Sequence, residues 1–129
     1  MGVSKRTSCP TEHFGDDGFK YGSDFEAHYY PSCMDGHSIY RWQTGGKYYL
    51  FTSHSFTLHE DTWNLFVPLG PKKRRDLMRP QLPKVAKLRI DYVFPGYSGN
   101  EIEGDGFYKL TGKTRSSLKA AFRQKMEGY

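Results

Sequence analysis

Three acidic side chains alternate with other residues in the stretch EIEGDGFYKL. They are Glu101, Glu103 and Asp105, and Lys109 follows four residues after the last of them. Carboxylates are ligands that Mg²⁺ prefers, and bound Mg²⁺ stabilises the attacking and leaving oxygens when a phosphodiester is cut. A lysine beside such a metal can neutralise the phosphate. The stretch therefore predicts a magnesium-dependent phosphodiester-cleaving site, and its alternative is a solvated acidic loop.

Asp91 is a further candidate ligand for that metal. It lies in the run VAKLRIDYVF at 85–94, where apolar and polar residues alternate. A period of two predicts a half-buried strand, on which Asp91 would share the outer face with Lys87 and Arg89. The strand would end before Pro95.

Cysteine and histidine spacing offers a second metal. Cys33 and His37 form C-x3-H, with three residues between them, and His54 and His59 form H-x4-H. Both spacings fall within the range that structural zinc sites use. The residues therefore predict a zinc site, and the alternative is two surface histidines and a buried thiol.

Positive charge is concentrated in the second half of the chain. Residues 1–70 carry five Lys and Arg against eight Asp and Glu, whereas residues 71–129 carry fourteen against six, and the whole chain has a net charge of +5. A basic half is typical of a protein that binds a polyanion. The candidate phosphate contacts are Lys72, Lys73, Arg74, Arg75, Arg79, Lys87, Arg89, Arg115, Lys119 and Arg123, and Trp42 and Tyr48 could stack on bases or belong to the core. We expect a nucleic acid partner, DNA rather than RNA, with a merely solvated surface as the alternative.

Turn and periodicity signals indicate the elements that must position these residues. Gly45 and Gly46 join two aromatic runs within 38–57, which predicts a hairpin, because both residues of a type I′ turn need a positive φ. Residues 58–70 could form a short helix or a third strand. The three prolines and six Lys and Arg of residues 71–84 favour an exposed basic loop.

The C-terminal segment 114–127 predicts an amphipathic helix. Its apolar residues Leu118, Ala121, Phe122 and Met126 recur three to four positions apart, and Thr114 or Ser116 could cap it. We therefore expect an α+β protein with an antiparallel hairpin-based sheet packed against this helix. Residues 1–36 form a polar, glycine-rich, partly irregular segment, and residues 37–129 form the single α+β domain.

The stretches SIYRWQTGGKYYL, VAKLRIDYVFP and EGDGFYK, in that order, resemble the RusA-type Holliday junction resolvases of phages. In that family a strand that ends near a proline is followed by two acids and a lysine at this spacing. The resemblance covers residues 38–110 and implies that Glu103 and Asp105 bind metal and that Lys109 is catalytic. The family's third acid has no counterpart between 112 and 126. The resemblance thus implies a magnesium-dependent, structure-selective DNA endonuclease or an inactive relative, and whether the chain is an enzyme stays open.

A non-catalytic function is the alternative. Small phage proteins can take over a host by inhibiting one of its nucleic-acid enzymes, and here the acids of residues 1–70 could imitate DNA while exposed aromatic side chains form binding hot spots. Two cysteines are too few for a disulfide scaffold, which favours a reducing compartment such as the cytoplasm. No apolar run is long enough to span a membrane. An exposed edge of the predicted hairpin would allow a homodimer.

Overall fold

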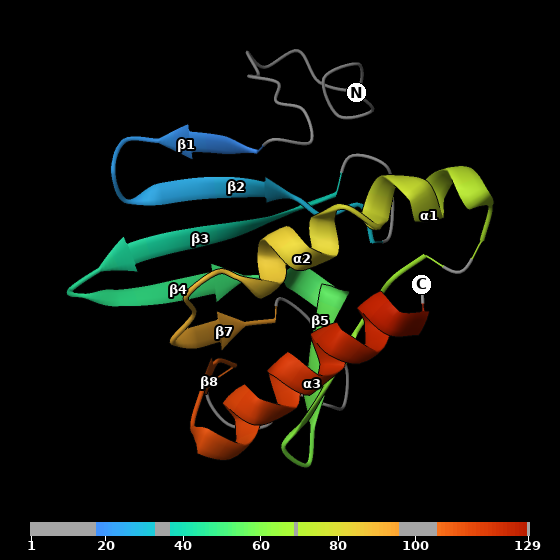
Figure 1. Cartoon of the computed structure of the whole chain (residues 1–129). Helices are drawn as coiled ribbons and strands as arrows, with labels where there is room; N and C mark the ends of the chain where they lie inside the picture. Colours follow the sequence, from blue (N-terminus) through green and yellow to red (C-terminus); the bar gives the residue numbers. More distant parts are fainter. Residues whose placement is uncertain (1–17, 33–36, 69, 96–105, 129) are drawn as a thin grey trace.

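The computed structural model describes residues 18–32, 37–68, 70–95 and 106–128 (Figure 1). In chain order the elements are β1 (Phe19–Tyr21), β2 (Phe25–Tyr29), β3 (Ser38–Thr44), β4 (Lys47–Phe51), the 3₁₀ turn η2 (Ser53–Ser55), β5 (Phe56–His59), β6 (Thr62–Leu65), α1 (Lys72–Met78), α2 (Gln81–Ala86), β7 (Tyr92–Phe94), β8 (Tyr108–Lys109) and α3 (Gly112–Gly128). The predicted α+β class is confirmed, with a mainly antiparallel sheet and a C-terminal helix.

The main sheet has six strands in the order β1-β2-β3-β4-β7-β8. All neighbouring pairs are antiparallel except β4 and β7, which are parallel. A parallel pair needs a long crossover, and here β5, β6, α1 and α2 supply it. Strands β5 and β6 form a separate two-stranded sheet.

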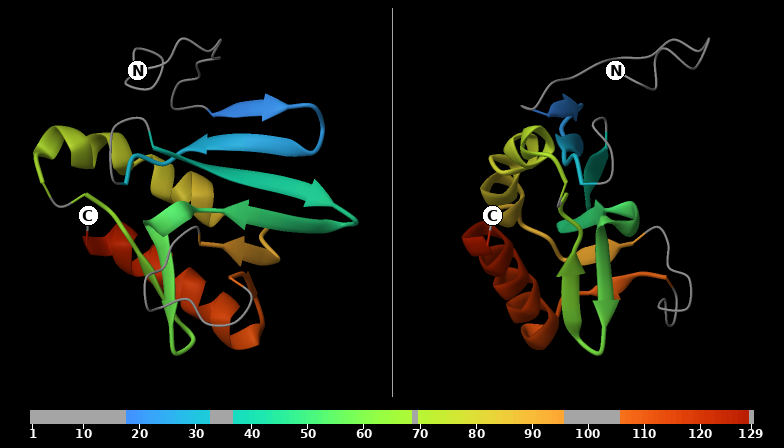
Figure 2. Two further views of the ribbon diagram at one scale, coloured as in Figure 1. Left: turned by 180° about the vertical axis from the view of Figure 1, so that it is seen from behind. Right: turned by 90° about the vertical axis from the view of Figure 1, so that its right-hand side faces the viewer.

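All three helices lie on one side of the six-stranded sheet (Figure 2). Side chains of successive strand residues point to opposite faces. Ile39, Leu50 and Val93 point toward the helices and are fully buried, and on the helix side Met78 and Leu82 are also fully buried. The core therefore sits between the sheet and the helices.

The other face of the sheet carries aromatic side chains. The strand register puts Trp42 opposite Tyr49, Tyr49 opposite Tyr92, and Phe51 opposite Phe94. We call this side the open face, because none of the three helices lies on it (Figure 2).

The predicted hairpin is confirmed. Strands β3 and β4 pair around Gly45 and Gly46, whose φ angles are 58° and 75°. These positive φ values belong to the left-handed region that glycine enters without a steric penalty. However, β3 also pairs with β2 and β4 with β7, so the hairpin has no exposed edge for the dimer that the sequence suggested.

The helix α3 is also confirmed, although it begins at Gly112. Thr114 therefore lies inside the first turn and is not the cap. Its hydroxyl oxygen accepts a hydrogen bond from the backbone N–H of Thr111 at 2.8 Å, as the side chain at position N3 of a capping box does. Leu118, Ala121 and Phe122 are buried as expected, whereas Met126 is 39% exposed.

Two sequence predictions are wrong between residues 71 and 91. The predicted basic loop is helical, because Pro71 precedes α1, Pro80 precedes α2, and Pro83 falls in the first turn of α2, where a missing N–H breaks no helix bond. The predicted strand at 85–94 is reduced to β7, and Val85 belongs to α2.

The N-terminal segment also holds more regular structure than expected. Strands β1 and β2 fall within residues 1–36, while residues 1–17 lie outside the described part. Residues 58–70 contain the end of β5 and all of β6, joined by Glu60 and Asp61 with φ of 48° and 65°. None of the described helices has the length and apolar character needed to cross a bilayer.

Candidate nucleic-acid interface

The helices carry the net positive charge of the described residues. Helices α1, α2 and α3, counted with the residues Arg79 and Lys87 that end the first two, hold twelve Lys and Arg and only two acids, Asp76 and Glu127. The rest of the described chain holds five basic and five acidic residues. Because the helices share one side of the sheet, an imbalance along the sequence becomes an imbalance between two sides of the molecule (Figure 2).

We call the exposed cations of these helices the basic helical layer. They are Lys72, Lys73, Arg79, Lys84, Lys87, Lys113, Lys119 and Arg123. Most of them were predicted as phosphate contacts, whereas Lys84 and Lys113 were not. Lys72 and Arg79 each form an ion pair with Asp76, at 2.6 Å and 2.7 Å. The hydrogen bonds from these two cations lower the pKa of Asp76, so its carboxylate stays charged.

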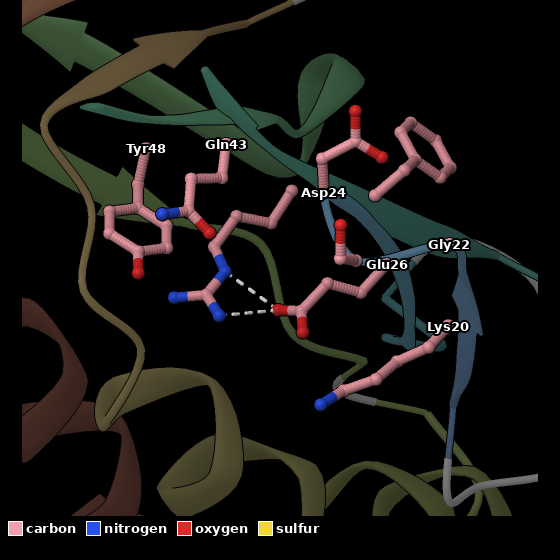
Figure 3. Close-up of a pocket in the computed structure, with 9 residues that line it drawn as sticks. Lys20, Gly22, Asp24, Glu26, Gln43 and Tyr48 are labelled. Atoms are coloured by element: carbon pink, nitrogen blue, oxygen red, sulfur yellow. Dashed lines mark hydrogen bonds and ion pairs between the residues drawn. The ribbon is translucent and has the colours of Figure 1, made fainter. Parts of the chain in front are cut away.

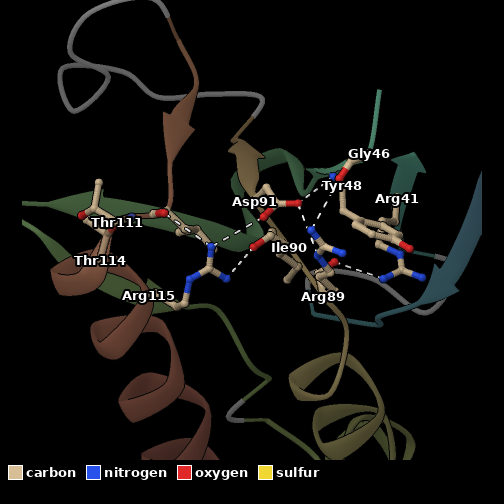
Figure 4. Close-up of polar contacts among 10 residues, drawn as sticks. Arg41, Gly46, Tyr48, Arg89, Ile90, Asp91, Thr111, Thr114 and Arg115 are labelled. Carbon is tan, nitrogen blue, oxygen red and sulfur yellow. Dashed lines mark hydrogen bonds and ion pairs between the residues drawn. The ribbon is translucent and has the colours of Figure 1, made fainter. Parts of the chain in front are cut away.

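Two further predicted contacts, Arg89 and Arg115, are engaged with the protein itself (Figure 4). The Arg115 Nη1 donates to the Ile90 carbonyl at 2.7 Å, which ties α3 to the segment before β7. Arg89 lies 5.0 Å from the ring centroid of Tyr48, and its Nε lies 3.7 Å from the Asp91 carboxylate. Both side chains therefore contact the fold itself. Arg89 is exposed nonetheless, so the half-buried Arg115 is the weaker candidate for phosphate. Arg74 and Arg75 are half-buried.

Tyr48 and Trp42, which were predicted to stack on bases, lie on opposite faces of the sheet. Trp42 pairs with Tyr49 on the open face, whereas Tyr48 pairs with Gln43 on the helix side. The Tyr48 ring lies between two guanidinium groups, with that of Arg41 4.5 Å away. Neither ring therefore lies within the basic helical layer.

A polar hollow of about 260 Å³ opens beside Tyr48 (Figure 3). Arg41 and Glu26 form an ion pair of 2.6 Å in its wall. Burial would raise the pKa of Glu26, but hydrogen bonds from His28 and Arg41 outweigh it, and the pKa is lowered. Two cations and two acids line this hollow, so the charge of its wall favours neither anionic nor cationic ligands.

The predicted magnesium site gains no support from the described residues. Glu101, Glu103 and Asp105 lie outside them, and Lys109 is an exposed residue of β8. The Asp91 carboxylate accepts a hydrogen bond from the Tyr48 backbone N–H at 2.9 Å and lies 3.7 Å from Arg115 (Figure 4). Asp91 thus holds β4 and α3 near β7.

Part of the predicted zinc set does come together. The His37 and His54 rings lie 6.2 Å apart, and His37 Nδ1 donates to the Tyr30 carbonyl at 2.9 Å. His59 ends β5, and Cys33 lies outside the described residues. Among the residues that the structure describes, no three His, Cys, Asp or Glu side chains gather in a way that could hold a metal ion.

No protein-family model matches the sequence, and no curated protein matches it either. Five chains of solved structures do match, and two of them are metallo-β-lactamases. A B3 metallo-β-lactamase with an active-site glutamic acid has a TM-score of 0.50 and 14% identity over 90% of this chain and 46% of its own. The metallo-β-lactamase MIM-1 from Novosphingobium pentaromativorans has a TM-score of 0.44 and 11% identity over 88% and 45%.

The chain therefore spans about half the length of these solved proteins, and at such identities the likeness is one of fold. This likeness in fold contradicts the resemblance to RusA-type resolvases that the sequence suggested. The strand that this resemblance needs over 85–94 is mostly absent, because α2 occupies its start. Both solved proteins are metalloenzymes by name, but the described residues of this chain do not complete a metal centre. No metal-dependent step is assigned to it.

Proposed function

We propose that this protein binds nucleic acid, and duplex DNA in particular, through the basic helical layer. One observation carries the proposal: α1, α2 and α3 hold twelve basic and two acidic residues, while the remaining described residues are balanced. Charge that is spread evenly over a solvated surface would not divide between two sides of a sheet in this way. A surface of one sign attracts a ligand of the other sign, and duplex DNA is a densely charged polyanion.

The layer is suited to phosphates more than to bases. Its exposed members are lysines and arginines of α1, α2 and α3, and the aromatic rings of the open face lie on the other side of the sheet from these helices. Contacts with phosphate position a protein on DNA and carry no direct sequence information. We therefore propose binding that is independent of sequence and that weakens steeply as salt rises, because each neutralised phosphate releases counterions. No catalytic step forms part of the proposal.

A fluorescence anisotropy titration with labelled duplex DNA, in EDTA and at several salt concentrations, tests this proposal. The double variant Lys119→Glu/Arg123→Glu reverses two exposed cations of α3. We expect it to weaken binding by tenfold or more at low salt and to reduce the slope of log K against log salt by about two.

A control variant separates a local effect from a change in net charge. Lys20→Glu/Lys47→Glu makes the same charge change at two exposed strand residues outside the helices. It should retain most of the affinity of the unmodified protein. Equal weakening by both variants would mean that net charge, and not the helical layer, governs binding, and an unmodified protein that does not bind DNA would refute the proposal.

A further inference from the structure

The open face holds a continuous row of rings that the proposed function does not use. Ring centroids lie 5.6 Å apart for Trp42 and Tyr49, 5.0 Å for Tyr49 and Tyr92, and 4.9 Å for Phe51 and Phe94. Phe94 continues the row to Phe107 at 5.2 Å. The row therefore runs from β3 across β4 and β7 to the start of β8.

Three pairs in this row are stacked, whereas the planes of Trp42 and Tyr49 are tilted by 38°. The planes of Tyr49 and Tyr92 differ by 11°, and those of Phe51 and Phe94 by 23°. A nucleobase needs a free ring face to stack on. Since neighbours cover ring faces in the stacked pairs, those rings leave little free face for a base, and the row suits close packing against apolar side chains of a protein.

Much of this apolar surface is exposed. Tyr21 is 68% exposed, Tyr40 41%, and Trp42 and Phe107 39% each. At about 150–250 Å² for each aromatic side chain, these four expose roughly 400 Å². Seven further rings on this face are half-buried: Phe19, Phe25, Tyr29, Tyr49, Phe51, Tyr92 and Phe94. With the area that these rings add, the accessible area of the face approaches the roughly 800 Å² that each partner buries in a stable interface.

The face is nearly free of charge. Among the paired strand residues that the structure describes, the register places no Asp or Glu on this face, and the charged residues there are Lys47, at the turn of the β3–β4 hairpin, and Lys109 in β8. Both lysines are exposed and can stay in water at the margin of an interface. An uncharged aromatic centre with a polar margin is the composition of an interface between protein subunits.

We infer that two copies of this chain pack their open faces together as a homodimer. A two-fold interface requires a surface that complements itself, and a face without opposed charges meets that condition. Two such sheets would lie about 10 Å apart with their side chains interleaved. Each sheet would then be covered on both sides, by its own helices and by the partner's sheet. This dimer uses the face of the sheet, not the hairpin edge.

Sedimentation velocity of the full chain over a wide dilution series tests the dimer. We expect a species of twice the 14.9 kDa chain mass that dissociates on dilution. Trp42→Lys/Phe107→Lys should raise the dimer dissociation constant at least tenfold. Met126→Lys is the control, because Met126 is as exposed as Trp42 but lies on α3, across the sheet. Circular dichroism confirms that each variant folds.

Quenching of tryptophan fluorescence identifies the surface that is buried. Trp63 is 3% exposed and Trp42 is 39% exposed, so the quenchable emission comes from Trp42. Quenching by acrylamide should decrease as the dimer forms. A chain that stays monomeric at every concentration overturns the inference, whether or not another protein binds this face. So does a dimer in which Trp42 remains accessible, or one that dissociates equally in the open-face variant and the Met126 control.

Discussion

The rings of Tyr49 and Tyr92 stack across the parallel strand pair β4–β7, with centroids 5.0 Å apart and planes 11° apart. They stand opposite each other in the register of the two strands. A stacked aromatic pair contributes about 0.5–1.5 kcal/mol beyond the area that it buries. The pair therefore helps to hold the only parallel junction in the described sheet, which no hairpin turn closes.

A double-mutant cycle measures that contribution. Tyr49→Leu and Tyr92→Leu should each lower the free energy of unfolding, and the double variant should lose less than the sum by about 0.5–1.5 kcal/mol. Urea denaturation at one fixed protein concentration gives the values, since a dimer gains stability by mass action. Losses that add up within experimental error would show that the two rings do not interact.

Three glycines should respond differently to replacement by alanine. Gly46→Ala places a Cβ at φ +75° with no atom nearby, so it should cost about 1–2 kcal/mol through backbone strain alone. Gly18→Ala should cost more, because its Cβ would meet the Ala27 carbonyl oxygen at 2.6 Å in addition to a φ of +82°. Gly112→Ala, in the first turn of α3, should be neutral or stabilising by up to about 1 kcal/mol. Thermal and urea unfolding check this order, and an equal cost at all three positions would contradict it.

Stability should fall as the pH drops below about 6.5, in part because of His37. Burial lowers the pKa of His37, the hydrogen bond to Tyr30 opposes this, and the neighbouring His54 lowers it further. On acidification the unfolded chain binds a proton at this position before the folded chain does, so folding loses free energy until the lowered pKa is passed.

His37→Asn isolates this effect, because its amide can still donate to the Tyr30 carbonyl. Urea midpoints between neutral pH and pH 5 should decline less in the variant than in the unmodified protein. Parallel declines would show that His37 titrates alike in the folded and unfolded states.

Asp91 should matter for stability. Asp91→Ala removes the acceptor of the Tyr48 N–H and the negative charge beside Arg89 and Arg115, and should cost about 1–3 kcal/mol. Asp91→Asn keeps an oxygen for that N–H and should cost less. Both variants should keep the DNA affinity of the basic helical layer once they are folded. A loss of binding by folded Asp91→Asn would connect this residue to the interface after all.

The sequence predicted the hairpin turn and the C-terminal helix correctly, because neighbouring residues largely determine both. Gly45 and Gly46 suit a tight hairpin turn whatever lies around them, and α3 has a helical repeat long enough to read. The missed helices show the limit of this reasoning. Met78, Leu82 and Val85 are buried at helical spacing, but the prolines around them conceal the pattern. Alternation in residues 85–94 then favoured a strand, although long-range packing made Val85 part of α2.

The candidate surfaces were predicted only in part for a similar reason. A sequence gives the sign of each charge but not the side of the sheet on which it lies. Lys119 and Arg123 share a layer with Lys72 only because the crossover from β4 to β7 places α1 and α2 on the same side as α3. Trp42 and Tyr48 are both aromatic members of one hairpin, yet the register puts them on opposite faces.

The division of the molecule into a basic side and an aromatic side has a consequence at the level of assembly. If two chains join through their open faces, the two basic helical layers point away from each other. Such a dimer has two DNA-binding surfaces that face in opposite directions. It would therefore cross-link two separate duplexes and would not bind a single duplex with both surfaces. DNA compaction would then rise with protein concentration. At a large excess of protein it would fall again, because separate dimers would saturate each duplex and each dimer would bind through only one of its surfaces.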